Sequence, residues 1–184
     1  MTAKAAFPPM ISPRAWVQRV PRVAWLTIAA LMTYAIVSHF MLAADPDASP
    51  RLRFSIEPII AASMAVQIHI TGAISAFLIG VILLMAPKGV RLHKTLGWTW
   101  VIAMSVTAVS SFFLTGMMGS TFSPIHALSA WTMIGLPFGI AAIRRRNIRE
   151  HRQSMTGMFV GGILIAGLFS FLPGRLMWQI FVTV

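Results

Sequence analysis

Long apolar segments alternate with short polar segments along most of this chain. Five of them contain no acidic or basic residue, and they cover residues 23–44, 59–86, 95–116, 124–143 and 153–172. Each approaches or exceeds the roughly 20 residues that a helix needs to cross the hydrocarbon core of a bilayer. The pattern predicts an all-α integral membrane protein with five transmembrane helices.

These helices and the segments around them divide the chain into four regions. Residues 1–22 are basic and contain several prolines, which predicts a cytoplasmic basic arm ahead of the first transmembrane helix at 23–44. Residues 59–172 form the predicted core of four helices. The last region, 173–184, begins with Pro-Gly, which ends the fifth helix, and we expect this amphipathic tail to lie at the membrane interface.

The second to fifth helices contain two copies of one pattern. Each copy begins with a histidine, crosses an apolar stretch and closes on a basic turn, Arg-x-His-basic, which holds a second histidine. The separation between the two histidines is nearly the same in both copies. Such a repeat predicts a four-helix bundle built from two repeated helical hairpins, with one N-terminal helix outside it. The paired residues are His69 with His126, Arg91 with Arg149, and His93 with His151.

Charge predicts how the helices are oriented. The chain has 15 Lys and Arg against 4 Asp and Glu, a net charge of +11. The basic residues gather in 1–22, 87–94 and 144–152, whereas the intervening loops are acidic or uncharged. Because basic loops stay in the cytoplasm, we expect a multi-pass protein of the bacterial inner (cytoplasmic) membrane with a cytoplasmic N-terminus. The expected partner of this charge is the lipid bilayer and its anionic headgroups, and we expect no nucleic-acid partner.

Composition narrows the chemistry that the chain can perform. A chain that is 57% hydrophobic and 10% charged exposes too much apolar surface for a soluble domain of 184 residues. Cysteine is absent, which excludes disulfides, thiolate metal sites and covalent haem attachment. Histidine is left as the strong side-chain ligand for a transition metal or a haem iron, and we predict no catalytic residue.

The repeat predicts where the histidines meet. A pseudo-two-fold axis along the membrane normal would carry His69 onto His126 and His93 onto His151. Each pair would then face across the bundle, one at the outer level and one at the inner level. Two neutral imidazoles on opposite sides of one iron are the ligands of a b-type haem, so the four histidines predict one or two haem b groups.

Small and basic residues near the histidines complete this predicted site. Gly80 and Gly162 lie about three helical turns from His69 and His151, where they would leave space for a flat macrocycle. Arg91 and Arg149 are placed to pair with haem propionates. In the competing interpretation the glycines only allow close helix packing, and the arginines only mark the cytoplasmic side.

Each histidine also has a structural interpretation. His93 and His151 could bind lipid phosphate or a helix end, and His69 could donate a hydrogen bond to a carbonyl of a neighbouring helix. His39, on the first helix, is expected to make a polar contact near the interface. The methionines are expected to pack or face lipid, although Met155 could approach a metal bound at His151.

The motifs resemble an uncharacterised family of bacterial membrane proteins, domain of unknown function 2306. The resemblance rests on His69, His126, Pro-Lys-Gly-x-Arg-x-His-Lys-x-x-Gly at 87–97, the Arg-rich run that ends in His-Arg-x-x-Met at 151–155, and Leu-Pro-Gly-Arg at 172–175. Histidines on successive helices are also similar to the core of the cytochrome b561 family of transmembrane di-haem proteins. That second resemblance implies the same ligand pairs, His69 with His126 and His93 with His151.

Three functions follow from these observations. The first is a membrane b-type haem protein that transfers electrons to or from quinone or a partner redox complex. The second is a non-catalytic accessory or assembly subunit of a larger respiratory or photosynthetic complex, in which the histidines serve packing. The third, a divalent-metal or proton transporter, ranks lowest because no acidic residue lies in a predicted helix beside the histidines.

Overall fold

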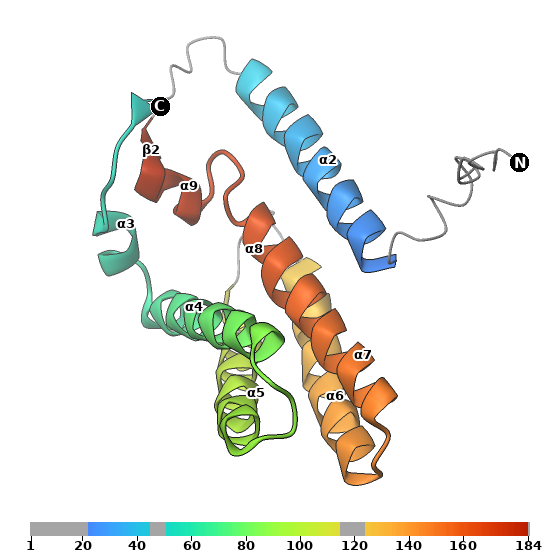
Figure 1. Cartoon of the computed structure of the whole chain (residues 1–184). Helices are drawn as coiled ribbons and strands as arrows, with labels where there is room; N and C mark the ends of the chain where they lie inside the picture. Colours follow the sequence, from blue (N-terminus) through green and yellow to red (C-terminus); the bar gives the residue numbers. More distant parts are fainter. Residues whose placement is uncertain (1–21, 45–50, 115–123, 184) are drawn as a thin grey trace, which may run out of the picture.

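The fold is a set of packed helices. The computed structural model describes residues 22–44, 51–114 and 124–183, so most of the predicted basic arm lies outside the described residues. The longer helices follow the apolar segments in order along the chain (Figure 1). They are α2 (Arg22–Ala43), α4 (Met64–Met85), α5 (Arg91–Ser111), α6 (Pro124–Arg144) and α7 (Ile148–Met158).

The second apolar segment does not form one helix over 59–86, as the sequence predicted. A short helix, α3 (Glu57–Ile60), precedes α4, and the chain bends between them. The Gln67 side chain fixes this bend, because its Nε2 donates hydrogen bonds to the carbonyls of Ile60 at 3.1 Å and Ala62 at 3.0 Å. The apolar composition of this segment predicts burial in lipid or protein, but it does not predict the break between α3 and α4.

The fifth apolar segment is also not a single α-helix over 153–172. After α7 the chain passes through a π-helical stretch, η1 (Phe159–Ile165), and ends in α8 (Ala166–Phe169). Two adjacent glycines, Gly161 and Gly162, lie in η1, where their low helix propensity weakens the regular turn. The helix starts earlier than predicted because Asn147 caps it, its side chain accepting a hydrogen bond from the Glu150 amide at 3.1 Å.

The two hairpins of the predicted core are present. The turn between α4 and α5 is shorter than the predicted 87–94, because α5 begins at Arg91 and so includes His93. Gly89 has a φ of 81°, a conformation that glycine adopts without steric cost. The second turn is also shorter than predicted, with Arg149 and His151 on α7. Both inner histidines therefore stand on helices rather than in loops.

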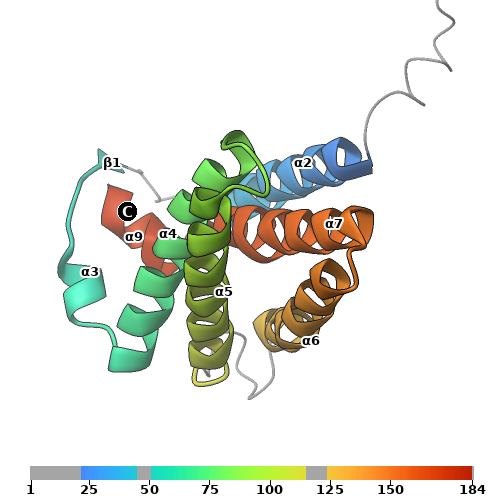
Figure 2. The ribbon, with the colours of Figure 1, turned by 60° about the horizontal axis from the view of Figure 1, so that its bottom comes forward.

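The helices pack in the order α4, α5, α6 and α7, and η1 returns to contact α4. The α6–α7 hairpin crosses the α4–α5 hairpin instead of running alongside it, as Figures 1 and 2 show. Helix α2 packs on the far end of the fifth helix, against η1 and α8. There the Tyr34 hydroxyl donates a hydrogen bond to the carbonyl of Phe171 at 3.1 Å.

The C-terminal tail folds back on the segment that follows α2. It contains α9 (Leu176–Phe181) and β2 (Val182–Thr183), and β2 pairs antiparallel with β1 (Arg51–Leu52). The Ser55 amide adds a hydrogen bond to the carbonyl of Ile180 at 2.9 Å. The tail is thus held by backbone pairing, and its predicted place at the membrane interface stays a prediction.

A small apolar core lies where the two hairpins cross. Trp100 and Met104 of α5 meet Met158 of α7 and Phe159 of η1, and each of these side chains is almost completely buried. Large apolar side chains elsewhere on the long helices are exposed, as expected for helices that face lipid. Among the described residues, the helices at Met64–Met85 and Ile125–Arg144 are long and apolar enough to cross a membrane.

Candidate functional site

His93 and His151 lie at the basic end of the core, where the charge of His151 affects His93. His93 is on the first turn of α5, before its apolar part, and its Nδ1 is buried without a hydrogen-bond partner among the described residues. Burial lowers the pKa of the His93 imidazole, and the nearby positive charges of His151 and Lys88 lower it further. His151 thus affects His93 electrostatically, and the pairing of the two imidazoles on one iron stays a prediction.

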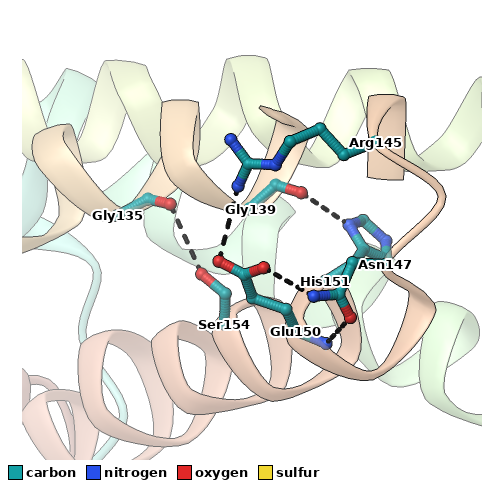
Figure 3. A network of polar contacts seen from close by, with 7 residues as sticks. All are labelled: Gly135, Gly139, Arg145, Asn147, Glu150, His151 and Ser154. Carbon is teal, nitrogen blue, oxygen red and sulfur yellow. Dashed lines mark hydrogen bonds and ion pairs between the residues drawn. The ribbon is translucent and has the colours of Figure 1, made fainter. Parts of the chain in front are cut away.

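The His151 ring is held in one orientation by α6. Its Nδ1 lies 2.9 Å from the carbonyl oxygen of Gly139, as Figure 3 shows. Because a carbonyl only accepts, Nδ1 is the donor in this bond, and Nε2 is the ring nitrogen that the bond does not use. A histidine that donates Nδ1–H to a backbone carbonyl and keeps Nε2 for a metal is a common arrangement in metal sites.

A Gly-x-x-x-Gly motif in α6, which the sequence analysis did not use, makes this contact possible. A Cβ at Gly139 would lie 2.6 Å from Cε of Met155, and one at Gly135 would lie 3.0 Å from Sδ of Met158. The two glycines thus let α7 approach α6 closely. Ser154 uses the same approach to donate a hydrogen bond to the carbonyl of Gly135 at 3.4 Å (Figure 3).

The basic turn between α6 and α7 is organised by one acidic residue. Glu150 accepts a hydrogen bond from Asn147 Nδ2 at 2.8 Å and pairs with Arg145 at 3.5 Å. Arg146 takes a positive φ of 60° in this turn. Arg91 and Arg149, the predicted propionate partners, are exposed on the first turns of α5 and α7, on the same helices as the inner histidines.

Replacing Asn147 with alanine should destabilise the start of α7. The substitution removes the side-chain acceptor for the Glu150 amide, and losing an N-cap of this kind costs about 1 kcal/mol. Unfolding in detergent, followed by circular dichroism during titration with sodium dodecyl sulfate, measures the change. Asn147→Asp keeps the acceptor and serves as the control; an equal loss in both variants would contradict the capping role.

His69 contacts α5 in the part of the core away from the basic turns. Its Nδ1 donates to the carbonyl of Thr107 at 2.9 Å and lies 3.4 Å from Oγ of Ser110. Gly72 allows α4 to approach here, since a Cβ at that position would lie 2.7 Å from Oγ1 of Thr107. As at His151, Nδ1 is the donor, and Nε2 is the ring nitrogen that this bond does not use.

A cluster of buried hydroxyl groups continues from His69 across α5 to α6. Ser111 and Ser129 share a hydrogen bond between their hydroxyls, and His126 is buried at the start of α6 with its ring 6.0 Å from that of Phe112. The sequence did not predict this cluster, because serine and threonine within an apolar run do not distinguish a buried polar site from ordinary helix surface. Its buried members are Thr107, Ser110, Ser111, His126, Ser129 and Thr132.

The faces of Gly80 and Gly162 are filled by side chains. A Cβ at Gly80 would lie 2.3 Å from the Phe159 ring and 3.0 Å from Trp100 Nε1, and one at Gly162 would lie 3.4 Å from Met104 Cε. These faces therefore offer no space for the predicted macrocycle, and the glycines serve close packing. Gly97, one turn after His93, differs, because a Cβ there would meet no other atom within 4 Å.

The predicted outer pair is less clearly assembled than the inner pair. His69 and His126 each contact α5, and their meeting across the bundle stays a prediction. His39 is exposed on α2, where the centroid of its ring lies 5.9 Å from that of the Phe40 ring. Among the described residues, no group of three or more His, Asp or Glu side chains could hold a metal ion. A haem needs only two protein ligands, since its macrocycle supplies the other four.

The packed helices and their broad apolar surface define a helical membrane protein. The chain belongs to the family described as Predicted membrane protein (DUF2306), whose model matches residues 66–181, well over half of the chain. That range contains His69, His93, His126 and His151, and it leaves out His39 on α2. No curated protein and no solved structure matches the chain.

Proposed function

We propose that this protein binds one haem b between His93 and His151 and transfers electrons in the bacterial inner membrane. The observation that carries the proposal is the buried Nδ1 of His93, which has no hydrogen-bond partner among the described residues and feels the charge of His151 on another helix. Two histidine nitrogens with an iron between them are the protein ligands of a b-type haem.

The residues around the pair have separate roles in this proposal. The hydrogen bond from His151 to Gly139 orients the imidazole and keeps Nε2 for the iron. The space beside Gly97 lies one turn from His93, on the same side of α5. Arg91 and Arg149 would pair with the propionates at the cytoplasmic surface. A bound haem would supply one-electron chemistry, with quinone or a partner redox complex as the exchange partner.

The proposal includes the topology expected from the sequence. Five spans with a cytoplasmic N-terminus would place both basic turns, and with them His93 and His151, at the cytoplasmic side. A second haem, on His69 and His126, would extend the similarity to the cytochrome b561 family. The protonated Nδ1 of His69 is compatible with such ligation, but the filled faces of Gly80 and Gly162 favour a single haem at the inner pair.

Expression with a haem precursor, followed by purification in detergent, tests the proposal. We expect a reduced-minus-oxidised spectrum with the α and Soret bands of a six-coordinate b-type haem. His93→Ala and His151→Ala should each abolish the low-spin spectrum, because one remaining imidazole cannot provide both axial ligands.

The matched control is His39→Ala, which changes an exposed histidine on a helix outside the core and should leave the spectrum unchanged. Thermal unfolding of each variant shows whether a lost spectrum reflects lost ligation or lost folding. A folded wild-type protein that stays colourless after haem-replete expression would contradict the proposal.

A second candidate is a non-catalytic accessory or assembly subunit of a larger respiratory or photosynthetic complex. It is favoured by the hydrogen bonds of His69 and His151 to carbonyls of neighbouring helices, which join the helices without any cofactor. In that case His93→Ala would leave the protein folded and its complex intact. Stable co-purification of a colourless protein with such a complex would support this candidate.

A further inference from the structure

The hydroxyl groups beside His69 already donate their hydrogen bonds to backbone carbonyls. Ser110 donates to the carbonyl of Val106 at 2.7 Å, and Thr107 donates to that of Ala103 at 2.8 Å. The same holds on α6, where Ser129 donates to Ile125 at 2.8 Å and Thr132 to Leu128 at 2.9 Å. The polar groups that remain available here are mostly acceptors, so a ligand at this place must bring its own hydrogen-bond donor.

An apolar groove runs along the outer face of α4 and α5 and reaches this acceptor group at Ser110. It has a volume of about 540 Å³, within the usual range for small-molecule sites. Its lining includes Met64 and Ile68 of α4 with Val106, Val109, Ser110 and Phe113 of α5.

A second groove of about 580 Å³ continues from the first towards the inner side. The two share Met64, Ile68 and Val106, and the second extends past Ser75 to Ile79 and Thr99. Met64 and Phe113 are 77% and 69% exposed, so a molecule dissolved in the bilayer could enter sideways. The two grooves together are mostly apolar, with Ser110 at one end and the polar side chains of Gln67, Thr71, Ser75 and Thr99 along the second groove.

We propose that this α4–α5 groove binds a prenylated quinol, with a ring hydroxyl at Ser110 beside His69 and the tail along the groove towards Thr99. A quinol hydroxyl supplies the donor that the acceptor group lacks. The aromatic ring of Phe113 lies at the same end and suits the quinol ring. The site deepens the proposed function, on which its redox role rests, and quinol binding can be measured separately from the haem.

Charge distinguishes this ligand from a phospholipid. None of the residues that line the two grooves is charged, so a phosphate headgroup would find no partner in them. The basic residues that could hold one, such as Arg91 and Arg149, begin helices at the other end of the core. A neutral headgroup with hydrogen-bond donors and a long hydrocarbon tail fits both parts of the groove.

Photolabelling tests the site in the full-length protein, reconstituted in nanodiscs. An azido-quinol with a decyl tail is activated by light, and the labelled peptides are identified by mass spectrometry. We expect labelling concentrated on 64–79 and 99–113, and suppressed by excess unlabelled decyl-quinol. Val106→Trp should lower it at least tenfold by filling the groove, and Ser110→Ala about tenfold by removing one hydrogen bond.

The control is Ile134→Trp, which adds the same bulk to an exposed position of α6 and should leave labelling unchanged. His93→Ala should also leave it unchanged, which separates this site from the haem proposal. Labelling spread over all lipid-facing helices, or suppressed equally by a phospholipid with the same tail, would overturn the proposal. Val106→Trp changes the groove without changing the buried hydroxyl cluster, so a loss of labelling in this variant does not depend on a folding defect at Ser110.

Discussion

Replacing Gly80 with alanine is expected to destabilise the core by about 1–3 kcal/mol, the usual cost of adding a methyl group to a filled interior. The new Cβ would lie 2.3 Å from Cε2 of Phe159, far inside van der Waals contact. The ring cannot easily move away, because it is 4% exposed and stacked on Phe77 with a centroid distance of 6.3 Å. Titration with sodium dodecyl sulfate measures the loss.

Two further variants make this prediction specific. Gly97→Ala places the same methyl group on α5 with no atom within 4 Å, so it should be neutral or slightly stabilising through helix propensity. Phe159→Leu in the Gly80→Ala background should recover part of the lost stability, because it removes the clashing ring atoms. Equal effects of alanine at Gly80 and Gly97 would contradict the packing seen at Gly80.

Replacing Trp100 with alanine is expected to have the largest effect, a loss of about 3–5 kcal/mol, as for large aromatic residues in other cores. Trp100 is 3% exposed and lies between α4 and the fifth helix. Its Nε1 donates to the carbonyl of Ala76 at 3.0 Å, so the variant loses both packing and a buried hydrogen bond. The effect is measured as a loss of the helical circular-dichroism signal at a lower concentration of sodium dodecyl sulfate.

Trp100→Phe separates the two contributions. The phenyl ring keeps most of the packing but cannot donate, so the expected loss is much smaller, about 1–2 kcal/mol. A Phe variant as unstable as the Ala variant would show that the hydrogen bond to Ala76 dominates, contrary to our expectation. Both variants leave the histidines in place, so haem binding can be measured in the same preparations.

Much of the fold could be predicted from the sequence, because apolar runs bounded by basic turns report helices directly. The start of α2 and the end of α6 lie within one residue of the expected bounds. The breaks could not be predicted in the same way. The bend before α4 depends on one amide side chain, Gln67, and the π-helical stretch depends on packing around Gly161 and Gly162, which hydropathy does not describe.

The candidate site was predictable in part. Repeat spacing indicated that His93 and His151 correspond, and the structure places both near the start of a helix; that they share one haem stays a prediction. The same argument assigned space to Gly80 and Gly162, which are filled, because a missing side chain does not show whether a neighbour occupies the gap. The hydroxyl cluster on α5 and α6 had no sequence signal that distinguishes it from ordinary helix surface.

The π-helical stretch has a consequence for how the fifth helix can change. A π turn accommodates one residue more than an α turn, so η1 offsets the angular position of everything that follows it. Deleting a single residue from 159–165 would restore a regular helix with little rotation of the segment beyond, because the π-helical stretch absorbs one extra residue. A regular helix of unchanged length would instead rotate that segment by about 100° around its axis. The docking of α2, including the bond from Tyr34 to Phe171, would then face the wrong way. The wide turn of η1 therefore sets where the first helix attaches.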